Sequence, residues 1–168
     1  MRRILGITCL GAIAASCMHA TLAAKRGIAM PDAVESIRLE RAKSNAAIAA
    51  RDLPGTIVSM LPDYRATWAL STTHRSRDSV AAALGRQYAD STILGCERTP
   101  ISIEISGTGP AAAEYGNFVC RRQQPSGIRT LVGTYYASWQ RIVEGWRLNS
   151  EVFVALRCTG STECPRFP

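Results

Sequence analysis

Apolar and polar residues alternate along the second half of the chain, and the longest such stretch covers residues 131–158. Its two arms are rich in apolar, β-branched and aromatic side chains, and Val143-Glu144-Gly145 separates them as a tight turn in which Gly145 supplies a positive φ angle. This pattern predicts a long hairpin, and a turn centred on Glu144 fixes its facing pairs. Those pairs are Tyr136 with Val152, Tyr135 with Phe153, and Trp139 with Asn149.

The second arm of this hairpin presents two different faces, because successive side chains of a strand point to opposite sides. One face is mainly apolar and is expected to lie on the core: Trp146, Leu148, Ser150, Val152, Val154 and Leu156. The other is more polar and is expected to face away from the core: Arg147, Asn149, Glu151, Phe153 and Ala155. This assignment depends on an unbroken register, since a slip of one residue exchanges the two faces.

The first half of the chain shows helical spacing instead. Apolar residues at roughly helical intervals, with Arg41 among them, predict a helix over residues 31–51. Asp52 is a typical N-cap for a short second helix that continues to Met60. Ser76 is a cap for a third helix over residues 77–88.

Strands are predicted between and after these helices. Residues 64–70 form a short strand pattern with Tyr64 and Trp68 on one face. Residues 92–106 contain three isoleucines, at positions 101, 103 and 105, that alternate with polar residues and predict a half-buried strand. Three helices followed by a run of antiparallel strands is an α+β layout.

The first residues of the chain predict an export signal. Two arginines precede an apolar run over residues 4–15, which is too short to span a membrane because a span needs about 20 residues. A signal peptide over residues 1–24 leaves a single domain over residues 25–168, in the periplasm or secreted. The alternative is a lipoprotein signal over residues 1–16, which leaves a lipidated Cys17 anchored at the bacterial membrane.

Four of the six cysteines lie in the predicted domain. In an exported protein we expect them to be oxidised. A turn centred on Thr108 joins the strand over residues 92–106 to a returning strand and sets Cys96 opposite Cys120, which favours one of the three possible pairings. The expected disulfides are Cys96–Cys120 and Cys158–Cys164.

The charge pattern and the motifs exclude several functions. The formal net charge is +7, but the basic residues are scattered and form no patch suited to nucleic acid, so no nucleic-acid partner is expected. The cysteines lack zinc-ligand spacing, and His74, in a polar loop, is expected to be exposed, so no metal site is predicted. Residues 107–112 match a dinucleotide-binding glycine pattern but lack the helix and the acidic residue that such a site needs. We therefore expect no cofactor.

The order of these elements and motifs resembles the nuclear transport factor 2-like superfamily. The matching positions run through the second helix, the strand after it and the long hairpin: Asp52, Ile57, Leu61, Asp63, Tyr64, Gly133, Tyr135, Trp139, Gly145, Trp146, Arg147, Leu148 and Glu151. The most similar branch is that of small bacterial domains grouped with polyketide-cyclase-like proteins. The resemblance implies a cone-shaped α+β fold, with three N-terminal helices packed on a curved antiparallel sheet. It also implies a pocket between helices and sheet, and a possible homodimer through the sheet.

Seven residues are candidates for the lining of this pocket: Tyr64, Trp68, Tyr88, Arg98, Glu114, Tyr136 and Glu151. Aromatic rings around a few polar groups suit a small, partly apolar molecule. Each aromatic ring is also consistent with an ordinary core position, and the charged residues with an ion pair between neighbouring strands. Glu151 falls on the more polar face of its strand, which counts against a place in the pocket. We predict no catalytic residues.

Three functions fit this sequence. The first is a non-catalytic pocket or accessory protein. The second is a small isomerase-, dehydratase- or cyclase-like enzyme, since some members of the superfamily use an Asp or His base beside tyrosine donors. The third is a dimerising assembly module. An enclosed pocket that holds a carboxylate against a tyrosine favours the enzyme, and an exposed apolar sheet face favours assembly.

Overall fold

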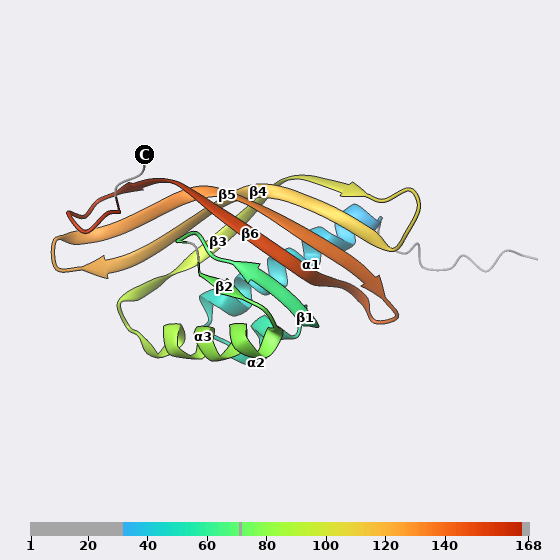
Figure 1. Cartoon of the computed structure of the whole chain (residues 1–168), viewed down its shortest axis with the longest axis horizontal. Helices are drawn as coiled ribbons and strands as arrows, with labels where there is room; N and C mark the ends of the chain where they lie inside the picture. Colours follow the sequence, from blue (N-terminus) through green and yellow to red (C-terminus); the bar gives the residue numbers. More distant parts are fainter. Residues whose placement is uncertain (1–31, 71, 166–168) are drawn as a thin grey trace, which may run out of the picture. The chain divides into compact units, whose positions relative to one another are not determined.

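The computed structural model describes residues 32–70 and 72–165, so the predicted signal peptide and Cys17 lie outside the described residues. Within these described residues the fold has three helices and six strands (Figure 1). The helices are α1 (Ala33–Ala49), α2 (Leu53–Ile57) and α3 (Arg77–Ala89). The strands are β1 (Met60–Thr67), β2 (Thr73–His74), β3 (Ile93–Ile105), β4 (Ala111–Gln124), β5 (Gly127–Ile142) and β6 (Gly145–Thr159).

The helices begin where their capping residues predict. The side chains of Asp32, Asp52 and Ser76 each accept a hydrogen bond from a backbone N–H in the first turn of α1, α2 and α3. The ends are less regular. α1 stops at Ala49, because Arg51 adopts a left-handed conformation with φ of 56°. α2 ends at Ile57, and β1 starts at Met60, four residues before the predicted strand.

The sheet is curved and mixed, with the strand order β2-β1-β6-β5-β4-β3. Strands β3 to β6 pair antiparallel, but β1 pairs parallel with β6. The prediction of a purely antiparallel sheet is therefore wrong for this pair. Two strands so distant in the sequence are not joined by a tight turn, so nothing local forces them to run in opposite directions.

The long hairpin follows the predicted register through part of its length. Tyr136 faces Val152 as predicted, and Gly145 has φ of +118° at the turn. Closer to the turn, Trp139 faces Leu148 instead of Asn149, because the register shifts between Ser138 and Trp139. Asn149 is thus the additional residue of a β-bulge.

This bulge exchanges the two faces of β6. Before it, Trp146 and Leu148 are buried in the core as predicted. After it, the inward positions are Glu151, Phe153 and Ala155, and the predicted core residues are exposed instead: Val152, Val154 and Leu156. The prediction for the outer half of β6 is wrong, because the sequence pattern carries no mark of the extra residue.

A second irregularity affects β3, where the register against β4 shifts between Pro100 and Ser102. Ile101 lies at this shift and is 54% exposed, whereas Ile103 packs against the core. Ile105 is the last residue of β3 and is 39% exposed. The two disulfides occur as predicted, Cys96–Cys120 between register partners on β3 and β4, and Cys158–Cys164 at the end of β6.

All three helices lie on the same side of the sheet (Figure 1). α1 contacts β3 and β6, and α3 contacts β1. The core between them contains Ile37 from α1, Tyr64 from β1 and Trp139 from β5, each at most 1% exposed. The sheet is very close-packed at Gly116, where an added Cβ would lie 2.4 Å from the Thr99 carbonyl oxygen. No helix among the described residues is long and apolar enough to cross a membrane.

Candidate ligand cavity and buried charge cluster

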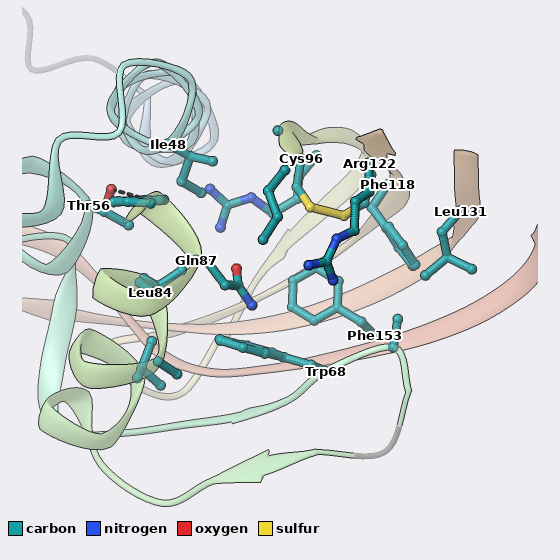
Figure 2. Close-up of a pocket in the computed structure, with 18 of the residues that line it drawn as sticks. Ile48, Thr56, Trp68, Leu84, Gln87, Cys96, Phe118, Arg122, Leu131 and Phe153 are labelled. Carbon is teal, nitrogen blue, oxygen red and sulfur yellow. Dashed lines mark hydrogen bonds between the residues drawn. A yellow bond between two sulfur atoms is a disulfide. The ribbon is translucent and has the colours of Figure 1, made fainter. Parts of the chain in front are cut away.

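A cavity of about 590 Å³ lies on the helical side of the sheet. Residues of α3, of β1 and of strands β3 to β6 line it, and apolar side chains predominate (Figure 2). Among them are Trp68 after β1, Leu84 on α3, Phe118 on β4 and Phe153 on β6. Phe118 and Phe153 meet edge to face at 5.4 Å between ring centroids. The volume suits a small organic molecule.

Five of the seven residues proposed from the sequence line this cavity: Tyr64, Trp68, Tyr88, Arg98 and Glu151. Two do not. Tyr136 is 53% exposed, and its buried neighbours in β5, Tyr135 and Ala137, point to the helical side. The prediction of Tyr136 as a pocket residue is therefore wrong by the alternation of the strand. Glu114 is completely buried and belongs to a charge cluster behind the cavity wall.

Two arginines and two glutamates form this buried cluster. Arg41 of α1 binds Glu114 of β4 through two hydrogen bonds, from Nε to Oε1 at 2.9 Å and from Nη2 to Oε2 at 3.1 Å. Its third nitrogen, Nη1, lies 2.8 Å from Oε1 of Glu151, at ion-pair distance though outside hydrogen-bond geometry. Arg98 of β3 completes the cluster, with Nη1 at 3.2 Å from Oε1 of Glu151. The four charges sum to zero.

Neutral donors satisfy the remaining carboxylate oxygens. The hydroxyl of Tyr64 donates to Oε2 of Glu151 at 2.6 Å. Glu114 accepts a hydrogen bond from the hydroxyl of Tyr135 and another from Nε1 of Trp139, the latter at 2.6 Å. Each carboxylate is therefore held by arginine and by a neutral donor, as a buried charge requires.

This arrangement changes the acidities of the cluster. Burial alone would raise the pKa of Glu151, but its ion pairs with Arg41 and Arg98 outweigh burial, and the pKa lies below its usual value. Burial and the adjacent negative charge of Glu151 raise the pKa of the Tyr64 hydroxyl well above its usual value. At neutral pH the pair is therefore an ionised carboxylate and a neutral phenol.

Many solved structures share this architecture. A nuclear transport factor 2-like protein of unknown function from Shewanella oneidensis MR-1 matches with a TM-score of 0.60 and 16% identity, over 71% of this chain and 97% of its own. A ketosteroid isomerase-like protein from Erwinia carotovora atroseptica SCRI1043 matches with a TM-score of 0.64 and 9% identity, over 76% and 99%. A hexachlorocyclohexane dehydrochlorinase matches with a TM-score of 0.62 and 10% identity, over 80% and 92%. This chain has the nuclear transport factor 2-like fold.

The predicted fold is thereby confirmed. No family model matches the sequence, and the search of the curated proteins found no match. Identities this low establish a shared fold and no shared activity. The narrower resemblance to the polyketide-cyclase-like branch stays a prediction.

Within this nuclear transport factor 2-like fold, two residues of the site are not among the predicted ones. Arg41 occupies an apolar position in the helical pattern of α1 and is buried. An arginine at such a position is the sequence feature that could have indicated a buried ion pair. The prediction that His74 is exposed is wrong, because it is half-buried and lines the cavity. The centroid of its ring lies 4.2 Å from the centroid of the Trp68 ring. Its Nε2 atom is buried and has no hydrogen-bond partner among the described residues.

Two groups at the cavity differ in how far they are engaged: the carboxylate of Glu151 is fully surrounded by partners, whereas Nε2 of His74 has no hydrogen-bond partner among the described residues. Glu151 lies against Tyr64, and a carboxylate held against a tyrosine in a pocket favours an enzyme. Yet Glu151 already accepts from Tyr64 and Arg98 and pairs with Arg41, and its lowered pKa makes it a weak base. Within residues 32–70 and 72–165, no group of three or more His, Cys, Asp or Glu residues could hold a metal ion.

Proposed function

We propose that this protein is an exported pocket protein that binds a small, partly apolar molecule and does not convert it. The observation that supports this proposal best is the state of Glu151. It is the carboxylate of the cavity wall that touches a tyrosine, and it is fully engaged with arginines and that tyrosine. A general base needs access to its substrate and a pKa near the working pH, whereas this carboxylate is 2% exposed and its pKa lies below its usual value.

Binding itself is supported by the aromatic lining. Trp68 has its ring against His74 at the cavity, and Phe118 and Phe153 lie on the sheet side. Such rings contribute both buried area and stacking to a ligand. Native mass spectrometry of the purified protein tests this directly, because a co-purified molecule adds a fixed mass that disappears on denaturation. Trp68→Ala should reduce the occupied fraction, whereas Val143→Ala in the exposed hairpin turn should not.

The enzyme alternative is tested with isomerisation and dehydration substrates. We expect wild type, Glu114→Gln and Glu151→Gln to remain at the background rate. A wild-type rate well above background that either substitution abolishes, in a variant that still folds, would make the protein an enzyme. That outcome would refute the non-catalytic proposal without affecting the fold.

Export is supported by the two disulfides, which are typical of proteins from oxidising compartments. Sequencing the N-terminus of the protein recovered from its host tests the signal peptide over residues 1–24. A start near residue 25 fits a soluble exported protein, and a lipidated Cys17 selects the anchored alternative. A protein that retains Met1 contradicts both.

A second candidate role, self-association through the sheet, rests on its exposed face. Tyr115, Tyr136 and Val152 are register partners across β4, β5 and β6 and are 41%, 53% and 45% exposed, which makes one continuous apolar row. Val154 and Leu156 extend it along β6. Exposed apolar patches commonly mark interaction surfaces. Sedimentation velocity should show a dimer that Tyr136→Glu dissociates, and a wild-type monomer at high concentration would rule this role out.

A further inference from the structure

Two arginines face each other across neighbouring strands in the cavity wall. Arg122 of β4 and Arg129 of β5 are direct register partners, and both line the cavity. Like charges placed directly opposite each other in a sheet are destabilising. The stability of the fold therefore does not explain why two arginines face each other here. An anionic ligand bound between Arg122 and Arg129 would explain it.

One of the two arginines has no counter-charge in the described part of the chain. Arg122 donates to the carboxylate of Asp90 and, from Nε, to the hydroxyl oxygen of Thr92 at 3.0 Å. Arg129 is half-buried, and no residue within 32–70 or 72–165 forms a hydrogen bond or an ion pair with its side chain. Asp90 thus neutralises Arg122, and no carboxylate of the described residues neutralises Arg129.

The whole cavity carries the same imbalance. Six arginines line it against two acidic residues, Asp90 and Glu151. Both acids are already paired with arginine, Asp90 with Arg122 and Glu151 with Arg98. The positive charge that remains lies beside apolar walls, where an anion would be attracted more strongly than in open water.

The arginines and the aromatic side chains of the cavity also lie close together. Figure 2 shows the side chain of Arg122 reaching into the cavity beside Phe118, with Trp68 and Phe153 on the walls around it. An apolar body and an anionic group of one molecule could therefore be held at the same time.

We propose that the cavity ligand is an amphiphilic anion, with an apolar body packed on Trp68 and Phe153 and an anionic oxygen head group bound by Arg122 and Arg129. The inference rests on the proposed function, since it specifies the molecule that the cavity binds. The planar guanidinium fork matches the oxygens of a carboxylate, sulfonate or phosphate.

Two fluorescent probes test the head group. Anilinonaphthalene sulfonate carries an anionic group, and phenylnaphthylamine has the same aromatic body without it. Arg129→Gln should weaken the sulfonate about five- to tenfold, the size expected for one charge-assisted contact, and leave phenylnaphthylamine unchanged. Trp68→Ala should weaken both probes, because both need the aromatic wall.

Asp90→Asn supplies a gain of affinity that damage to the fold would not produce. It frees Arg122 from its carboxylate while its carbonyl oxygen can still accept from the Thr92 N–H. The sulfonate should bind several-fold more tightly and phenylnaphthylamine unchanged. Arg141→Gln, an exposed arginine of the same strand outside the cavity, is the matched control and should alter neither probe.

The outcomes separate this inference from the function on which it rests. If the wild type binds neither probe, the proposed pocket function fails and the inference with it. If both probes bind but Arg129→Gln affects them equally or not at all, or Asp90→Asn fails to strengthen the sulfonate, the anion site is overturned while pocket binding stands. Competition with naphthoate and with dodecanoate then distinguishes a short aryl acid from an acyl chain as the source of the head group.

Discussion

The charge cluster behind the cavity makes a sharp prediction about stability, centred on Glu114. This carboxylate is completely buried and accepts from Arg41, Tyr135 and Trp139. Glu114→Gln keeps the shape but removes the charge, and it turns an NH₂ group towards one set of donors. Removing one partner of a buried ion pair costs about 3–5 kcal/mol. We therefore expect a loss of about 4 kcal/mol in the free energy of unfolding.

The measurement is urea unfolding followed by tryptophan fluorescence, with thermal unfolding as a second readout. For a domain of this size the loss corresponds to a melting temperature lower by about 10–15 °C. Glu104→Gln, at an exposed position of β3, is the control and should change the stability by less than about 0.5 kcal/mol.

A double substitution decides whether charge balance is the cause. Arg41→Met alone leaves Glu114 without its cation, but Arg41→Met with Glu114→Gln leaves the neutral pair Arg98 and Glu151. The double variant should therefore lose about 1–3 kcal/mol less free energy of unfolding than the two single variants lose together. If the two losses add within about 0.5 kcal/mol, the reasoning from paired charges is refuted.

Three further predictions concern acid stability, packing and the disulfides. The pKa of Glu151 is lower in the folded than in the unfolded protein, so its contribution to the free energy of unfolding is complete above about pH 4.3 and is lost as the pH falls through the folded pKa. Glu151→Gln should therefore reduce the loss of stability below about pH 5 in acid titrations. Gly116→Ala places a Cβ 2.6 Å from the Tyr135 ring and should cost about 2–3 kcal/mol in urea unfolding, whereas Gly109→Ala, with no atom within 4 Å, should cost far less. Replacing the cysteines of the Cys96–Cys120 bridge by serines should lower the free energy of unfolding by about 2–4 kcal/mol. Replacing Cys158–Cys164 should cost less, because its cysteines are 6 residues apart in sequence and those of the first bridge are 24 apart; equal losses in urea unfolding would contradict a loop-entropy origin.

Features fixed by neighbouring residues could be predicted from the sequence. The N-caps Asp52 and Ser76 act on backbone groups within the next few residues, and the Cys96–Cys120 bridge follows from the register of one hairpin. The end of α1 could not be predicted, because the left-handed position that closes it is occupied by Arg51 instead of glycine. The side chain of Arg51 donates to backbone carbonyls of Tyr88 and Ile93, contacts that lie far away in the sequence.

The site was predicted in part for the same reason. Tyr64 and Trp68 were found because aromatic residues on a short strand suggest a wall. Arg41 reaches Glu114 across 73 positions of sequence, and no local pattern links them. Glu151 was placed on the wrong face because the bulge at Asn149 reverses the strand after it. Long-range pairing and one inserted residue therefore account for most of the difference between the predicted site and the site in the structure.

That bulge also divides β6 into two parts that lie in different surroundings. The residues before it, Trp146 and Leu148, are buried in the core, whereas Glu151 and Phe153 after it face the cavity. Substitutions at Glu151 and Phe153 would change the lining of the cavity, while Trp146 and Leu148 would still anchor the hairpin in the core. Deletion of Asn149 is a different kind of event, because it would turn Glu151 outwards and leave Arg98 without its anion in a single step. The ion pair between Arg98 and Glu151 therefore depends on the length of β6 as well as on the two residues that form it.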